Sequence, residues 1–409
     1  MNILLIDSVD LPFGSAHSVH VSLLIKGLRE NKENAFLIVR YGHKREVLSS
    51  NKKKFGHYDG IPYCFVRQDK PANKFIRFMD RFVGVFNTAE LIYRRNKKKK
   101  VDAVILGGAD ILKDSPIILT CAFLKIPIYF WLVEKGSLDE DIHGIVGYLN
   151  HKSQKFSEKY LPKFASGIIV ISSNLKKHYL KYLPESKILI NPILVSEEIH
   201  KSINTQSIDI VRVRLQAAFK DKRLLVYSGS FGEQDGLFYL IEAFAEVVKK
   251  YPDTVFIMTG KNYNEIIMNK VRNHIRQYHL EDKIQLTGFV NSDELLAYQT
   301  MADILLVCRS NSPFSNHGFP WKLGEYCMTA KPIIATRVSD IEEYFSDNES
   351  LFIVEPNNPK AIAEKVNYIF DDYKQALSIA KKSKEIALKE FGYLKKAKEF
   401  IAFIKQNKK

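Results

Sequence analysis

Short apolar runs alternate with stretches of helical periodicity along the chain. The first run, Asn2–Asp7, is followed by a glycine-containing turn and then by apolar residues at helical spacing between positions 19 and 28. Further short runs rich in β-branched residues, which we expect to be strands, occupy 35–40, 62–66, 101–106, 127–132 and 167–172. Strands that alternate with helices predict a parallel sheet covered on both faces.

This alternation lapses between 191 and 222 and then resumes. The second series of expected strands occupies 224–228, 255–259, 283–286, 304–307, 332–335 and 351–354. We therefore expect two doubly wound, Rossmann-like α/β domains whose strand-end loops face one interdomain cleft. The expected boundaries are 1–195 for the first domain, 196–222 for a linker, 223–388 for the second domain and 389–409 for a C-terminal helix that crosses back to the first.

Composition agrees with a two-domain protein outside the membrane. The 409 residues exceed the roughly 250–300 at which single cores stop growing. No apolar run reaches the ~18 residues of a spanning helix, and the first residues lack the basic start of a signal peptide. These features predict a cytoplasmic protein. The cysteines at 64, 121, 308 and 327 are far apart and outside any metal-binding spacing, so we expect buried thiols.

The segment from Gly318 to Glu325 carries the clearest candidate chemistry. We expect a loop that enters a helix at Pro320, and the first turn of a helix attracts anions. Lys322 adds a positive charge suited to a diphosphate, and Glu325, one turn further on, can accept hydrogen bonds from ribose hydroxyls. From these residues alone, an ordinary helix with a surface lysine remains an equal alternative.

The string Gly-Phe-Pro-Trp-Lys-Leu-Gly-Glu-Tyr at 318–326, followed by Ala-Lys-Pro-Ile-Ile-Ala-Thr at 330–336, resembles the donor segment of family 4 glycosyltransferases of GT-B fold. Supporting strings keep the family's order: Val-Tyr-Ser-Gly-Ser at 226–230, Leu-Ile-Glu-Ala-Phe at 240–244, Met-Thr-Gly at 258–260, Leu-Thr-Gly-Phe-Val at 286–290, Ala-Asp-Ile at 302–304 and Val-Glu-Pro at 354–356. They cover nearly the whole second half, whereas the first half resembles the family more loosely.

The resemblance implies a retaining, metal-independent transfer of a sugar from a nucleoside diphosphate sugar to a hydroxyl acceptor, with no further cofactor. It implies that Glu325 holds the ribose, that Lys322 and the 318–319 backbone approach the diphosphate, and that the 288–290 loop lies beside the base. The full expected donor set is Gly14, Ser15, Gly229, Ser230, Lys261, Gly288, Phe289, Val290, His317, Gly318, Phe319, Lys322, Leu323 and Glu325. No catalytic nucleophile is evident. His317 and His17 are the candidates near the sugar.

Three positions depart from the family's pattern. His317 stands where many members have an acidic residue, Ser230 replaces the usual Arg, and Asp235 replaces the usual Lys. Because a diphosphate leaving group needs stabilisation, Lys322 and Lys261 would have to supply the missing charge. Two alternatives therefore stay open: an impaired nucleotide-binding protein, and a nucleotide-sugar epimerase of similar architecture.

Two other candidate sites have simple structural explanations. Asp139, Glu140 and Asp141 have the form of an Asp-X-Asp metal motif, but acidic residues at a helix start also complement the helix dipole. His17 and His20 lie close to the glycine loop and could touch a sugar, although a histidine on an amphipathic helix is more often structural. We therefore expect no metal site.

Positive charge concentrates in the first half. Of the residues between 40 and 100, 17 are Lys or Arg and 5 are Asp or Glu, within a net charge of +15. Apolar residues recur at helical spacing from 75 to 86, and the basic run 94–100 follows. This pattern suits an anionic membrane surface and a lipid-linked or glycan acceptor, as in surface polysaccharide or glycoconjugate assembly. A helix packed on the sheet with a solvated lysine loop explains it equally well. No nucleic-acid-binding module accompanies the charge.

Overall fold

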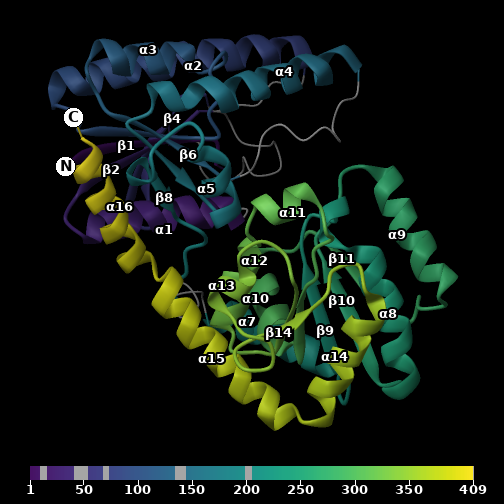
Figure 1. Ribbon diagram of the computed structural model, residues 1–409. Coiled ribbons are helices and arrows are strands. Elements are labelled where there is room, and N and C mark those ends of the chain that lie inside the picture. Colours follow the sequence, from purple (N-terminus) through teal and green to yellow (C-terminus); the bar gives the residue numbers. More distant parts are fainter. Residues whose placement is uncertain (10–15, 41–53, 68–72, 134–143, 199–204, 409) are drawn as a thin grey trace. The chain divides into compact units, whose positions relative to one another are not determined.

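The computed structural model of the chain describes residues 1–9, 16–40, 54–67, 73–133, 144–198 and 205–408. The chain divides into two compact units. Unit 1 contains Met1–Leu194 and Tyr393–Lys409, and unit 2 contains Val195–Gly392. Each unit has one sheet with helices on both faces (Figure 1).

Among the described residues of unit 1, eight strands form a sheet in the order β3-β4-β2-β1-β5-β6-β7-β8. Their bounds are β1 Asn2–Asp7, β2 Asn34–Val39, β3 Phe55–Tyr58, β4 Ile61–Phe65, β5 Ala103–Gly107, β6 Ile128–Leu132, β7 Gly167–Val170 and β8 Ile188–Ile190. All neighbours are parallel except β3 and β4. The direction of winding reverses at β1 and β5, where ligands of open α/β sheets bind.

Two layers of helices cover this sheet (Figure 1). One layer holds α2 (Lys74–Lys98), α3 (Ser115–Phe123) and α4 (Gly144–Tyr160), and the other holds α1 (Ala16–Glu30) and α16 (Tyr393–Asn407). A Cβ atom at Gly27 of α1 would lie 2.8 Å from the Cβ of Ala397, so glycine permits the close approach of α16. Tyr129 of β6 also donates a hydrogen bond to the Ile404 carbonyl (3.1 Å). The last helix is therefore an integral part of unit 1.

In unit 2 the described residues form a parallel sheet in the order β11-β10-β9-β12-β13-β14. The strands are β9 Arg223–Ser228, β10 Thr254–Thr259, β11 Ile284–Gly288, β12 Ile304–Val307, β13 Ile333–Thr336 and β14 Phe352–Val354. The winding reverses between β9 and β12. These two strand ends therefore form the switch point of unit 2.

The helices of unit 2 follow the apolar pattern of their sequences. In α8 (Leu237–Lys250) the buried residues include Leu240, Phe244 and Val247, which recur at helical spacing on the face toward the sheet. One layer contains α8, α9 (Glu265–Gln277) and α14 (Pro359–Asp371). The other contains α7 (Thr205–Ala218), α10 (Ser292–Met301), α12 (Trp321–Met328) and α15 (Tyr373–Phe391). The shorter α5 (Ser173–Tyr179), α11 (Pro313–His317) and α13 (Ile341–Tyr344) complete the helices named here.

The structure differs from the sequence-based expectation in one helix and two strands. The stretch 196–222, expected to be a linker, contains α7, because Leu215 is buried and Arg212 hydrogen-bonds Thr300 of α10 (3.3 Å). The two strands that we did not expect are β3, which is mostly exposed and antiparallel, and β8, which has only three residues. Two parallel-sheet α/β units were predicted, and this is confirmed. All four cysteines are buried and free, also as predicted.

Candidate functional site

The switch point of unit 2 gathers most of the predicted donor residues. Gly229 and Ser230 follow β9, Lys261 follows β10, Gly288 ends β11, and the 318–325 segment follows β12. Because these strands are parallel and adjacent, their carboxyl ends meet at one edge of the sheet. The structure thus brings residues that are up to about a hundred positions apart into one edge of unit 2.

Lys322 forms a partly buried ion pair with Asp235. The ammonium lies 3.1 Å from Asp235 Oδ1, and the two side chains are 18% and 7% exposed. The ammonium also lies 4.2 Å from the centre of the Tyr227 ring, a cation–π geometry. Burial lowers the pKa of Lys322, and the charge of Asp235 opposes that effect. The acidic residue that departs from the family's pattern is therefore the counter-ion of the predicted phosphate-binding cation.

Glu325 lies one turn after Lys322 on α12. Burial raises the pKa of its carboxyl group, and Gln299 and Lys322 act in the opposite direction. Gln299 itself is buried on α10. The adjacent Tyr326 is buried too, and its hydroxyl accepts a hydrogen bond from the Ser228 amide (2.9 Å), which ties α12 to the end of β9. A carboxylate held in this way can accept hydrogen bonds from the two hydroxyls of a ribose.

The chain entering α12 is more ordered than the expected loop. Residues 313–317 form the short helix α11, capped by the Ser312 hydroxyl, which accepts a hydrogen bond from the Ser315 amide (3.1 Å). His317 ends α11, with its Nδ1 2.8 Å from the Pro313 carbonyl oxygen. The α12 start at Pro320 has no side-chain cap. The helix predicted to begin at Pro320 is observed to begin one residue later, at Trp321. The predicted loop is wrong for Asn316 and His317, which belong to α11.

Two residues of the expected donor set have side chains in the core. Phe319 is buried and packs edge-on against Tyr344 and Phe391, with ring centres 5.9 and 5.7 Å away. Leu323 is fully buried on α12. Their side chains therefore hold α12 in place, and only the backbone of Phe319 remains for contact with a ligand.

The predicted base loop lies at the end of β11. The Gly288 carbonyl accepts a hydrogen bond from the Gly260 amide (2.8 Å), which links the ends of β10 and β11. Both glycines have positive φ values, 106° for Gly260 and 70° for Gly288. Phe289 is 77% exposed beyond this junction, and Val290 is half-buried beside it. Lys261 is exposed, with its ammonium 4.8 Å from the centre of the Tyr263 ring. An exposed aromatic ring at this edge is suited to stacking on a base.

Arg309 is a cation of this region that the sequence reasoning missed. It lies two residues after the end of β12, and its charge lowers the pKa of both Asp235 and Lys322. One guanidinium nitrogen lies 3.4 Å from the position that a Cβ of Gly318 would occupy. The only sequence signal was a basic residue two positions after an expected strand of the second series.

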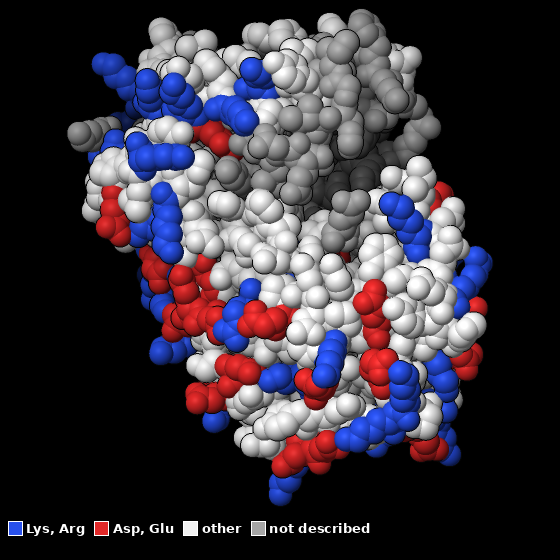
Figure 2. Space-filling model, turned by 45° about the vertical axis from the view of Figure 1, so that its right-hand side comes forward, with Lys and Arg blue, Asp and Glu red and all other residues white. Residues whose placement is uncertain are grey.

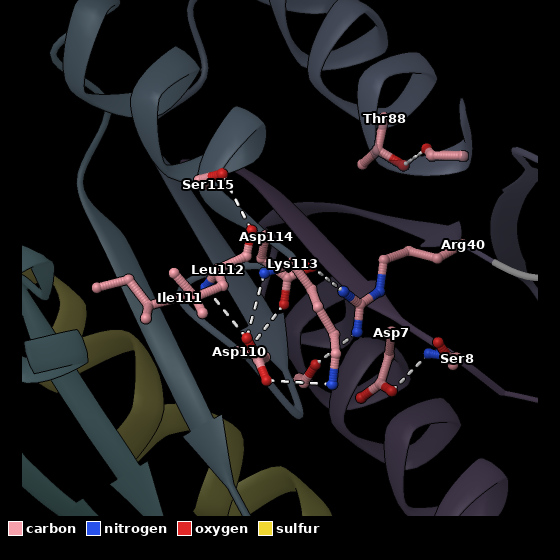
Figure 3. Close-up of polar contacts among 12 residues, drawn as sticks. Asp7, Ser8, Arg40, Thr88, Asp110, Ile111, Leu112, Lys113, Asp114 and Ser115 are labelled. Carbon is pink, nitrogen blue, oxygen red and sulfur yellow. Dashed lines mark hydrogen bonds and ion pairs between the residues drawn. The ribbon is translucent and has the colours of Figure 1, made fainter. Parts of the chain in front are cut away.

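Unit 1 has its own polar cluster at its switch point (Figure 3). Arg40 follows β2, is 5% exposed, and lies 2.6 Å from Asp114 at the start of α3. It also donates a hydrogen bond to the Gly107 carbonyl at the end of β5 (3.0 Å). Burial raises the pKa of Asp114 even though the Arg40 charge opposes this. Asp110 accepts hydrogen bonds from the Leu112 and Lys113 amides and so shapes the turn before α3.

The two histidines of α1 have different environments. His17 lies 3.2 Å from the buried Asp7 at the end of β1. Burial alone would raise the pKa of Asp7, but the hydrogen bond and charge of His17 and the charge of Arg40 lower it. His20 is buried against Trp131 and accepts a hydrogen bond from the Leu194 amide (3.1 Å), so it holds the fold together. The expected sites at Gly14 and Ser15 and at Asp139, Glu140 and Asp141 lie outside the described residues.

Comparisons of sequence show that the chain is similar to known glycosyltransferases. Residues 213–386 match the family model "Glycosyl transferases group 1". Spore coat protein SA of Bacillus subtilis is 20% identical over 204 residues, which cover 48% of this chain and 52% of that protein. This chain thus spans about half the length of that relative. The 2-deoxystreptamine N-acetyl-D-glucosaminyltransferase of Niallia circulans is 22% identical over 77% of this chain and 78% of its own.

Comparison of structures covers the whole chain. Anabaena HepE, solved in complex with UDP and glucose, superposes with a TM-score of 0.74 at 14% identity, over 99% of both chains. At this level of sequence identity, the structural similarity shows the fold alone. The chain therefore has the two-domain GT-B fold of glycosyltransferases, and its residues 213–386 match the group 1 glycosyl transferases.

Proposed function

We propose that the protein is a glycosyltransferase that takes its sugar from a nucleoside diphosphate sugar bound at the switch point of unit 2. The observation that carries the proposal is the grouping of Lys322, Arg309 and Glu325 at the ends of β9 and β12. Two cations there suit a diphosphate, and a partly buried carboxylate one helical turn away suits a ribose. The similarity to an N-acetyl-D-glucosaminyltransferase and to a protein solved with UDP supports this assignment and makes UDP-sugars the first donors to test.

The proposed reaction is transfer of a hexose-type sugar to a hydroxyl of a glycan or lipid-linked acceptor, with retention at the anomeric carbon. No further cofactor is needed in this scheme. Lys322 and Arg309 would stabilise the charge that develops on the departing diphosphate. Glu325 would orient the nucleoside so that the anomeric carbon is presented in a fixed position. His317 and His17 stay candidates for contact with the sugar.

A thermal-shift screen of UDP-, GDP- and ADP-sugars tests the proposal. A ligand that binds only the folded protein raises its apparent stability, by about 2.7 kcal/mol at a hundred times its Kd. We expect one nucleotide class to raise the melting temperature by several degrees, and the free nucleoside monophosphate to raise it less because it lacks the second phosphate. If no nucleoside diphosphate sugar shifts the transition at millimolar concentration, the proposed function is wrong.

Product analysis separates the two alternatives. An epimerase would change the configuration of the donor sugar without any acceptor, whereas a transferase releases nucleoside diphosphate in proportion to the acceptor glycosylated. An impaired nucleotide-binding protein would show the thermal shift and neither reaction. The ion pair between Lys322 and Asp235 weighs against impairment, because it gives the acidic residue a structural purpose at the site.

We propose that unit 1 docks on an anionic membrane surface through α2 and α3. The apolar residues of α2 were expected to contact either the sheet or a membrane, and several are exposed: Ile76, Met79, Phe82, Val83 and Phe86. An apolar groove of about 430 Å³ is lined by residues of both α2 and α3, among them Leu119 and Phe123 of α3, which are 64% and 78% exposed. The basic run 94–100 forms the C-terminal end of the same helix and the two residues after it. Apolar residues beside cations suit a lipid surface.

The distribution of charge is consistent with docking through unit 1. On the face drawn in Figure 2, Lys and Arg predominate on unit 1, whereas both signs alternate over unit 2. None of the described helices is both long and apolar enough to cross a membrane. The proposed association is therefore peripheral, on the inner face of the membrane, where a lipid-linked acceptor would be found.

Sedimentation with liposomes measures this association. We expect binding to vesicles with about 30% anionic lipid at low salt and release at 0.5 M salt, because each cation near the surface contributes about 1 kcal/mol. Replacing Lys97, Lys98, Lys99 and Lys100 by Gln should abolish most of the binding, and Phe123→Ser should weaken it without changing its salt dependence. The matched control replaces Lys381 and Lys382 of α15 by Gln. Equal binding of all variants would refute the docking face.

A further inference from the structure

Asp235 is an acidic residue at a proposed anion site. A carboxylate close to a bound diphosphate would repel it, so its presence beside Lys322 calls for an explanation. Its pKa is nevertheless low: burial would raise it, but the charge of Lys322, its hydrogen bond and the nearby Tyr227 hydroxyl outweigh that effect. Asp235 is therefore ionised in the folded protein at neutral pH.

The Asp235 carboxylate is held by contacts to both of its oxygens. Oδ2 accepts hydrogen bonds from the Ser230 hydroxyl (3.2 Å) and from the Gly232 amide (3.1 Å). Oδ1 lies 3.1 Å from the Lys322 ammonium. Ser230 and Gly232 lie in the turn after β9, and Asp235 ends a single 3₁₀ turn, Glu233–Asp235. The carboxylate is thus fixed relative to the end of β9.

The turn that carries Asp235 is fixed to β12 as well. Gly236 follows with a φ of 63°, and a Cβ there would lie 2.2 Å from the Cys308 carbonyl oxygen. The Ser310 amide donates a hydrogen bond to the Gln234 carbonyl (3.0 Å). Only glycine suits this contact and this φ value. Asp235 therefore has a defined position between the two strand ends of the switch point.

The Lys322 side chain is confined by the residues around it. Its ammonium faces the Tyr227 ring, and a Cβ at Gly229 would lie 2.7 Å from that ammonium and 2.1 Å from the Tyr227 hydroxyl oxygen. The absence of a side chain at Gly229 leaves the room that Lys322 fills. The Tyr227 hydroxyl is buried and lies near Asp235 without hydrogen-bond geometry to it. A long flexible lysine side chain is thus confined to one place.

From these contacts we infer that Asp235 is a positioning residue, which holds the Lys322 ammonium over Gly229 so that it can bind the diphosphate of the donor. This inference rests on the proposed function. An ammonium has three N–H donors, and Asp235 takes one of them, so donors remain for phosphate oxygens. Arg309 supplies the second cation from the end of β12. Ser230 and Asp235 then form the support of the phosphate site.

The expected effect of Asp235→Asn on anion affinity is the opposite of the effect expected from its charge alone. Removing a negative charge from an anion site would by itself strengthen anion binding. If Asp235 positions Lys322, however, Asp235→Asn releases the ammonium toward solvent and weakens binding. Isothermal titration calorimetry with UDP and with inorganic pyrophosphate measures the sign. We expect about tenfold weaker binding of both, the size typical for loss of a charged hydrogen-bond partner.

Matched variants isolate the positioning role. Asp235→Glu keeps a carboxylate and should recover part of the affinity. Asp347→Asn removes the acid of another ion pair in unit 2, in which Asp347 lies 3.0 Å from Lys365, and should leave the affinity unchanged. Ser230→Ala removes one hydrogen bond to Asp235 and should weaken binding about two- to threefold. This variant also decides the matter if Asp235→Asn does not fold.

The pH dependence of pyrophosphate affinity gives a readout that a purely structural ion pair would not change. The ionisable groups facing Lys322 are Asp235, Tyr227, Arg309, Cys308 and Glu325. Asp235 is the largest influence raising the pKa of Lys322, against burial, which lowers it. Without Asp235 the ammonium loses its proton at lower pH. As the pH rises, the affinity for pyrophosphate should therefore begin to fall at a lower pH in Asp235→Asn than in the wild type.

The outcomes separate this inference from the proposed function. If wild-type protein binds UDP and Asp235→Asn binds it equally well or more tightly, the inference is wrong and the proposed function stands. Unchanged affinity in Ser230→Ala would also overturn it, and so would an unshifted pH profile in Asp235→Asn. If the wild type binds neither UDP, GDP nor ADP, both fail.

Discussion

Replacing Glu325 by Ala is expected to weaken nucleoside diphosphate binding about 10- to 100-fold, and to lower sugar transfer at least as much. Hydrogen bonds to a charged group contribute about 1.5–3 kcal/mol each, and the proposed ribose contact uses this carboxylate. Binding is measured by titration calorimetry and transfer by release of nucleoside diphosphate. Lys322→Ala should produce a loss of similar size, because it removes a cation from the same ligand.

A control and a pH profile make the result specific. Glu364 is an exposed carboxylate on α14, and Glu364→Ala should leave binding unchanged. Because burial raises the pKa of Glu325, the wild type should lose nucleoside affinity as the pH falls through that raised value, since the protonated acid accepts fewer hydrogen bonds. Full activity in both Glu325→Ala and Lys322→Ala would place the donor site elsewhere.

Arg40→Met is expected to destabilise unit 1 by about 3–5 kcal/mol at pH 7.5, the cost of leaving one member of a buried ion pair without its partner. Asp114 is 2% exposed and would lose the guanidinium that lies against its carboxylate. Trp131 lies in unit 1 and is fully buried, and the chain's other tryptophan is Trp321. In a Trp321→Phe background, urea unfolding followed by tryptophan fluorescence therefore reports on unit 1 alone.

The destabilisation of unit 1 by Arg40→Met should depend on pH in a definite direction. Asp114 already has a raised pKa, and removal of Arg40 raises it further. A carboxyl group whose pKa is higher in the folded than in the unfolded state reduces stability as the pH rises through that interval. The destabilisation by Arg40→Met should thus be smaller at pH 5 than at pH 7.5.

An exposed ion pair of the same length serves as the control. Arg94 lies 2.6 Å from Glu90, with side chains 70% and 56% exposed, and Arg94→Met should cost less than about 1 kcal/mol. Equal effects of the two substitutions would contradict the role assigned to the buried pair.

The order of elements could be predicted from the sequence because the two units repeat one simple pattern. The strand Asn2–Asp7 is buried at every position, and its apolar run was sufficient to identify it. The strand Phe55–Tyr58 is mostly exposed, and it is a strand only because it pairs with the strand beside it. Helix α7 was missed for a related reason, since its contacts with α10 come from a distant part of the chain.

The candidate site, like the fold, could be predicted from the sequence only in part. The sequence by itself determined the doubly wound pattern, the helix that begins near Pro320, and the presence of Lys322 and Glu325 one turn apart. Those features depend on local periodicity and on residues close together in the chain. The tertiary structure alone decided that Asp235, 87 positions away, pairs with Lys322 and that Arg309 joins them. Such contacts exist only once parallel strands from different parts of the chain end at the same edge of a sheet, and no local pattern encodes that meeting.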